Sequence, residues 1–191
     1  ATPYIDIPAD RNFPVAIAPA NSASAGDAIL TVPFIADSGK TYTAFASGLV
    51  GNGATPLTIF PDNSRETALN PANFEFNIHH GSPGVPALDI NIAGAGNAVN
   101  GISYAGFSPY FSLLPATYTF EVKPAGSGVA PDKFTGNFSN LAGKTAKVFA
   151  SGVASGLPEF GLFAAYSDGT VVALPRQQGP ARIQVIHNAP D

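Results

Sequence analysis

Two histidines occupy matching places in this sequence and are the first residues to consider for metal or catalytic chemistry. His80 and His187 each precede a proline by three positions and lie 187 − 80 = 107 residues apart. A zinc site needs three or four ligands that converge on one point, and one histidine in each of two repeats does not supply them. We therefore expect each histidine to cap the end of a strand and to hydrogen-bond to a nearby backbone group or carboxylate.

Two aspartates, Asp6 and Asp89, form the second candidate pair, because two carboxylates about 5–9 Å apart can hydrolyse a glycosidic bond. Each aspartate lies within a predicted strand that follows a proline-containing loop. They belong to different repeats, so we expect them to lie far apart. The expected role is structural, because a charged residue that faces outward or lies on an edge discourages the association of sheets.

Three further motifs have simpler interpretations. Gly39–Thr41 and Gly143–Thr145 end in the letters of a phosphate loop, but they lack its upstream glycine and lead into predicted strands, so we expect turns. Asp62–Glu66 could hold calcium weakly, but a solvated loop is expected. Core packing, rather than an exposed sugar-binding platform, is expected for the aromatic cluster of Tyr104, Phe107, Tyr110 and Phe111. The sequence thus predicts no enzyme activity, no metal and no cofactor.

The composition favours a folded, exposed β protein. Hydrophobic residues make up 45% of the 191 positions and charged residues 12%, which is enough apolar surface for a core. Nine Lys and Arg residues form no basic stripe and no apolar run has membrane-spanning length, so neither nucleic acid nor membrane insertion is expected. The 20 Gly and 18 Pro residues favour many turns over long helices, and the absence of Cys and Met suits an extracellular or cell-surface location.

Period-two alternation of apolar residues is the main secondary-structure signal. It is clear over residues 74–80, 117–122 and 181–187, which predicts half-buried strands, and a further strand is expected at Tyr4–Ile7. Many short strands separated by frequent turns are typical of sandwiches and barrels. The sequence therefore predicts an all-β protein of two tandem antiparallel β-sandwich domains, immunoglobulin-like or transthyretin-like.

An internal repeat supports the division into two domains. Gly39–Leu49 matches Gly143–Val153 at an offset of 143 − 39 = 104, and Phe74–His80 matches Ala181–His187 at an offset of 181 − 74 = 107. The second copy is longer between matching positions, because it contains an extra hairpin-sized element at 104–115. The C-terminal segment therefore resembles the start of a domain that is not followed by its continuation.

The spacing indicates where that continuation lies. His80 precedes Asp89 by nine positions; four positions separate His187 from Asp191, and six more reach Asp6, giving ten. Joining the end to the start thus restores the repeat to within one residue. We expect residues 1–70 to form a first sandwich that lacks its first strand, residues 71–178 a complete second one, and residues 179–191 a strand that completes a first-type domain.

Three stretches, Arg182–Asp191, Pro109–Val122 and Leu141–Gly152, together resemble the uncharacterised domain-of-unknown-function family 4397. The resemblance is strong over residues 74–175 and partial over 1–70, which lacks the Pro-Tyr-Phe-x-Leu-x-Pro element. It implies secreted or surface-displayed β-sandwich modules, often in tandem. It implies no catalytic residues.

The expected function is structural: an extracellular filament or surface array whose subunits donate a C-terminal strand head to tail to the next copy. Heterologous contacts that do not close into a ring generate filaments, and an added strand gains backbone hydrogen bonds and side-chain pockets. The alternatives are a strand that folds back in its own chain and one period of a longer tandem array. A secreted carbohydrate- or cell-wall-binding module is the second functional candidate, with a surface glycan or cell-wall polymer as partner. The expected donated residues are Ala181, Arg182, Ile183, Gln184, Val185, Ile186 and His187.

Overall fold

The computed structural model describes residues 1–51, 53–179 and Ile183, and this part of the chain is almost entirely β. Its one helical element is a single 3-10 turn, η1 (Ala25–Asp27). The strands of residues 1–70 are β1 (Asn12–Ile17), β2 (Leu30–Ile35), β3 (Thr41–Ser47) and β4 (Thr58–Ser64). This architecture confirms the predicted all-β class.

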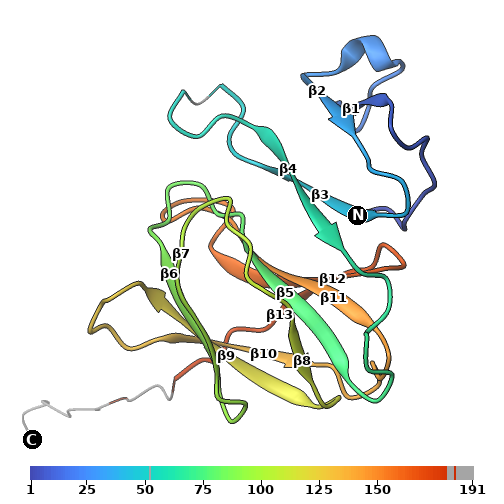
Figure 1. Cartoon of the computed structure of the whole chain (residues 1–191). Helices are drawn as coiled ribbons and strands as arrows, with labels where there is room; N and C mark the ends of the chain where they lie inside the picture. The colour runs from blue at the N-terminus through green and yellow to red at the C-terminus, as the bar shows by residue number, and fades with distance from the viewer. Residues whose placement is uncertain (52, 180–182, 184–191) are drawn as a thin grey trace, which may run out of the picture.

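The remaining strands form two stacked sheets (Figure 1). One sheet has the order β10-β9-β6-β7 and the other has the order β13-β12-β11-β5-β8. These strands are β5 (Phe74–His80), β6 (Leu88–Ile92), β7 (Asn97–Ile102), β8 (Phe111–Leu113), β9 (Thr117–Pro124), β10 (Asp132–Asn137), β11 (Thr145–Ser151), β12 (Gly161–Tyr166) and β13 (Val171–Leu174). We call this pair of sheets the sandwich.

The hydrophobic core lies between the two sheets of the sandwich. Alternate residues point inward, so that Phe74, Phe76 and Ile78 of β5 are completely buried. The rings of Phe74 and Phe138 stack with their centroids 4.6 Å apart, and Phe76 meets Phe120 edge to face at 5.8 Å. Each such side chain contributes roughly 1.5–3 kcal/mol by leaving water.

Strand β5 is buried on both faces, which corrects the expectation of a half-buried strand. All seven of its residues are buried. The inner face meets the core, while the outer face, with Glu75, Asn77 and His79, is covered by the β3–β4 hairpin (Figure 1). β5 also lies between two neighbours in its sheet: it pairs antiparallel with β8 and parallel with β11.

Residues 1–70, which we call the first region, form two separate two-stranded sheets, β1–β2 and β3–β4. The β3–β4 hairpin lies on the sandwich, and β1–β2 lies beyond it (Figure 1). The strand predicted at Tyr4–Ile7 is not found, because these residues pair with none of the described strands. The equivalent β6 is held as a strand by pairing with both β7 and β9.

The sequence repeat is also a structural repeat at the level of the hairpin. β3 pairs with β4 in the same way as β11 pairs with β12, with Ser47 opposite Thr58 and Ser151 opposite Gly161. Each hairpin continues into a glycine of positive φ, Gly48 or Gly152. A Cβ at either glycine would lie 2.2 Å from a carbonyl oxygen across the loop. Only glycine fits such an approach, so both copies need it for the same reason.

Candidate functional site

The free edge of β3 is the main structural difference between the two hairpins. β11 has β12 on one side and β5 on the other. Its repeat equivalent, β3, pairs with β4 alone among the described strands. An edge of this kind presents backbone N–H and C=O groups that can accept another strand.

One face of the same hairpin is also uncovered. Val148 and Ala150 of β11 have no exposed surface, whereas the residues 104 positions earlier, Ala44 and Ala46, are exposed. The neighbouring β4 residue Pro61 is exposed as well. The face that forms the core of the sandwich in one copy therefore meets solvent in the other.

A groove of about 820 Å³ runs beside the β3 edge. Its walls include residues 1–7, residues 41–44 of β3, and Ala165 and Tyr166 of β12. The Tyr4 hydroxyl lies 3.0 Å from Thr43 Oγ1 across the groove. The groove is therefore bounded by the N-terminal residues, by β3 and by the outer face of the sandwich.

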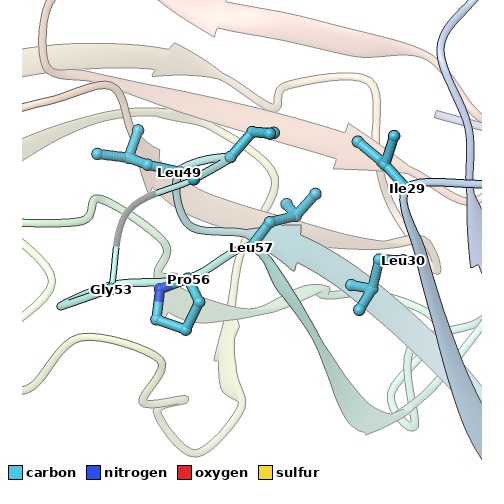
Figure 2. A pocket seen from close by; sticks show the side chains of 8 residues that line it. Ile29, Leu30, Leu49, Gly53, Pro56 and Leu57 are labelled. Atoms are coloured by element: carbon cyan, nitrogen blue, oxygen red, sulfur yellow. The ribbon is translucent and has the colours of Figure 1, made fainter.

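A second, smaller depression of about 310 Å³ opens at the end of the first region (Figure 2). Ile29 and Leu30 lie on one side of it and Leu49 on the other, with Leu57 between them. In the sandwich, the residue at the place of Leu57 is Phe160, whose ring meets Phe134 at 6.1 Å. The interior is thus open in the first region at a place where the sandwich is filled.

A buried ion pair fixes the hairpin to the sandwich. Lys147 Nζ of β11 contacts Asp62 Oδ2 of β4 and donates to the Tyr110 hydroxyl at 2.8 Å. Asn77 Nδ2 of β5 donates to the same Asp62 oxygen at 2.9 Å. The Lys147 side chain is only 6% exposed. Asp62–Glu66 is therefore not the solvated loop that the sequence predicts, because it begins within β4 and its Asp62 and Arg65 side chains bind the sandwich.

A second ion pair lies next to the first. Arg65 Nη1 donates to Glu75 Oε2 at 2.9 Å, and the guanidinium lies over the Tyr110 ring at 4.5 Å. Burial raises the pKa of Glu75, but hydrogen bonds from the Leu69 backbone, Arg65 and Ser112 outweigh it, and the net pKa is lowered. Glu75 is thus held ionised as a structural partner of the hairpin.

His79 lies at the centre of the same contact between the β3–β4 hairpin and the sandwich, which we call the joint. Its ring stacks on that of Phe107 with the centroids 4.2 Å apart, and the tilted ring of Phe45 of β3 lies 4.5 Å away. Nδ1 lies 3.1 Å from the Gly106 carbonyl, which makes Nδ1 the protonated nitrogen, while the buried Nε2 has no hydrogen-bond partner among the described residues. Burial lowers the pKa of His79 to about 4. His79 is therefore a neutral packing residue.

His80 and Asp89 also have structural partners. His80 Nε2 lies 2.9 Å from the Pro86 carbonyl, which confirms the expected hydrogen bond to backbone, and burial lowers its pKa. The Asp89 carboxylate accepts the Gly126 and Gly101 N–H groups, each at 2.9 Å, and these bonds lower its pKa. Asp89 thus ties the turn at Gly126 to Gly101 of β7, a role that the sequence does not predict.

The aromatic cluster does not form a single exposed patch. Phe107 packs on His79, and Tyr104 meets the ring of Phe60 in β4 at 5.9 Å. Phe111 packs on Phe76 of the core at 5.5 Å. All four aromatic residues are half-buried, in keeping with the packing role expected for them.

Of the expected donated residues, Ile183 is described, and its side chain is 90% exposed. The other six, Ala181, Arg182, Gln184, Val185, Ile186 and His187, lie outside the described residues. Within the described part of the chain, no three acidic or histidine side chains gather as metal ligands would. No helical segment there has the length and hydropathy needed to cross a bilayer.

Comparison with known proteins gives one match. No curated protein and no solved structure is similar to this chain at a significant level. A family model described as a domain of unknown function, DUF4397, matches residues 74–191. The match covers the whole sandwich and continues through the C-terminal segment, and it spans 191 − 74 + 1 = 118 of the 191 residues. The chain therefore belongs to the DUF4397 family.

Proposed function

We propose that this protein is an extracellular structural subunit that assembles head to tail into a filament or surface array. Residues 181–187, which we call the donor, leave their own chain and complete the first region of the next copy as a second sandwich. The observation that carries the proposal is the free edge of β3, at the place where the equivalent β11 pairs with β5.

The energetics favour a donated strand of this composition. Ile183 and Val185 contribute roughly 1.5–3 kcal/mol each when they leave water. Each backbone hydrogen bond of the new ladder adds about 1 kcal/mol. The ordering of the donor opposes these gains, but the acceptor strand is already formed. The contact joins two different surfaces, so its repetition gives an open polymer unless the rotation closes a ring.

The path of the chain after β13 supports donation to another copy. Gln177 Nε2 donates to Thr135 Oγ1 at 2.9 Å, and the Gln177 N–H donates to the Lys133 carbonyl. Thr135 points outward from the four-stranded sheet, away from its buried neighbour Phe134. The chain therefore reaches residue 177 on the side of the sandwich opposite the β3–β4 hairpin.

The distance from residue 177 to β3 of the same chain is then too long for the start of the donor to reach β3. The hairpin and the two sheets form three layers, and packed sheets lie about 10 Å apart, so β3 is about 20 Å from the four-stranded sheet. The four residues from Gln177 to Ala181 span at most about 14 Å. This shortfall supports transfer to a neighbour over fold-back.

The test is to compare the intact chain with a variant that lacks residues 181–191, by sedimentation and negative-stain electron microscopy. The intact chain should form long polymers, and the truncated chain should give monomers or insoluble protein. A synthetic peptide of residues 181–191 should bind the soluble truncated chain. Fibres from the truncated chain would contradict the proposal, as would an intact chain that is only a small discrete particle.

A further inference from the structure

We propose that the donor pairs with β3 in parallel and in a single register, with Arg182 opposite Thr41 and Gln184 opposite Thr43. This inference rests on the proposed function and specifies the acceptor surface and the geometry of the contact. It makes the free edge of β3 and the groove beside it a binding site for one segment of a second copy of this chain.

The register follows from the complete copy of the repeat. In the sandwich, Thr145 of β11 lies opposite Glu75 of the parallel β5, and each later pair advances by one residue on both strands. Thr145 corresponds to Thr41 at the offset of 104, and Glu75 corresponds to Arg182 at the offset of 107. Transferring the pair therefore places Arg182 opposite Thr41.

The alternation of the donor suits this register on its inner face. Ile183 and Val185 then lie beside Tyr42 and Ala44, on the face of β3 that points away from the sandwich. Ala44 is exposed in the single chain, whereas Val148 at the equivalent place of β11 is buried beside β5, so Ala44 is free to contact Val185 of the donor. A slip of one residue would turn every side chain to the other face, bringing Arg182 and Gln184 against the apolar interior.

The outer face of the donor has a surface to rest on as well. The β3–β4 hairpin lies over β5 and β11 together, because Phe45 of β3 meets both His79 at 4.5 Å and Phe149 at 5.5 Å. The groove beside the free edge of β3 is lined by Ala165 of β12. A donor strand added at this edge therefore lies over β12. The donor is then covered on both faces, as its equivalent β5 is.

The N-terminal residues occupy part of this groove in the single chain. Residues 1–7 line it, and the Tyr4 hydroxyl contacts Thr43. The arriving donor displaces them from β3. The repeat matches Asp6 with Asp89 of β6, and β6 pairs with β9. β9 is the equivalent of β1, because residues 118–125 match residues 13–20 in the sequence. The displaced residues therefore find a partner at the free edge of β1, which explains why they form no strand before assembly.

Cysteine pairs test the register directly, because the chain has no cysteine of its own. The in-register variant carries Thr43→Cys with Gln184→Cys. Two matched controls keep Thr43→Cys but move the second cysteine to Val185 or to Arg182. After mild oxidation, denaturing gels without reductant should show a ladder of covalent multimers for the in-register variant, at least tenfold stronger than for either control.

The outcomes separate this inference from the proposed function. A stronger ladder from a control, or equal ladders from all three variants, would overturn the proposed register. If microscopy still shows polymers in that case, the proposed strand donation is not contradicted. Cross-linked monomers from the in-register variant would overturn donation to a neighbour, because the bond would then lie within one chain. Polymers that form without any ladder would overturn β3 as the acceptor.

Discussion

The hairpins β3–β4 and β11–β12 have the same pairing and the same glycine turn, but very different surroundings. In β11–β12 the inward residues Val148, Ala150 and Ala164 are completely buried, and in β3–β4 their equivalents Ala44, Ala46 and Pro61 are exposed. The difference comes from the neighbours of each hairpin, because β11 has β5 beside it and a full sheet opposite it. A repeat thus fixes the local strand pairing, while other parts of the fold determine its burial.

The outer faces of the two hairpins differ in sequence. β11 carries Lys147 where β3 carries Thr43, and β4 carries Asp62 where β12 carries Ala165. These changes create the ion pair that joins one hairpin to the other. The two copies have therefore diverged at the positions of this ion pair, while the inward Ala44 and Ala46 are apolar like Val148 and Ala150.

An aspartate at the same repeat position gives the largest expected contrast between the two regions. Val148→Asp buries an unpaired carboxylate in the core and should cost more than about 4 kcal/mol, enough to unfold most domains. Ala44→Asp is exposed in the single chain and should change the free energy of unfolding by about 0.5 kcal/mol or less. Denaturant titration of both variants measures the difference.

The same pair distinguishes stability from assembly. Ala44→Asp should stay folded but lose polymers, because the donor's Val185 then meets a charge. Ala44→Ser is the matched control and should keep both properties. Equal destabilisation by Val148→Asp and Ala44→Asp would show that the first region already has a closed interior, and the comparison would then fail.

The ion pair between the two regions gives the next largest effect. Lys147→Met and Asp62→Leu each leave one charge without its partner, and each should cost about 3 kcal/mol. The double variant should cost clearly less than the sum of the two, because it leaves no unpaired charge in the joint. A double-mutant cycle by denaturant titration measures the coupling.

An exposed ion pair in the sandwich serves as the control for this cycle. Lys133 and Glu121 lie 2.8 Å apart, but their side chains are 47% and 23% exposed. Lys133→Met and Glu121→Gln should show a coupling of at most about 1 kcal/mol. Equal coupling in the two cycles would mean that the hairpin does not shield the Lys147–Asp62 pair from water.

The strands themselves were predictable because their signal is local. The alternation over residues 74–80 coincides with β5, and that over 117–122 lies within β9. The match of Gly39–Leu49 with Gly143–Val153 correctly indicates two equivalent hairpins. In each case the pattern lies within a few residues and does not depend on the rest of the fold.

The joint was not predictable in the same way, because it depends on contacts between distant residues. Lys147 and Asp62 are 85 positions apart. The polar residues on one face of β5 predict exposure, and they are buried because the hairpin supplies their partners. The one available signal was a strand with Glu75 and Asn77 on a single face in a chain of few charges. That signal indicates a polar contact but not its partner.

The smallest expected effect is a pH dependence that belongs to the joint. The pKa of His79 is about 4 in the folded chain, because burial disfavours the charged ring, and it returns to about 6.5 on unfolding. The unfolded chain therefore binds more protons between these values. Stability should fall as the pH drops through this window and stay constant above it. From pH 7 to pH 5 the loss from His79 is about 2 kcal/mol.

The variant His79→Leu isolates this contribution. Leucine keeps an apolar side chain between Phe45 and Phe107, and the Gly106 carbonyl still accepts the His80 N–H at 3.0 Å.

Titrations should be made in the Ala44→Asp background, so that assembly does not contribute. Staying at pH 5 or above keeps Glu75 ionised, since its pKa is lowered. His80 also has a lowered pKa and adds a loss of the same sign in both chains, so the difference between them reports His79 alone. An identical loss in the two chains would mean that His79 is already hydrated, and that the hairpin does not cover β5 in solution.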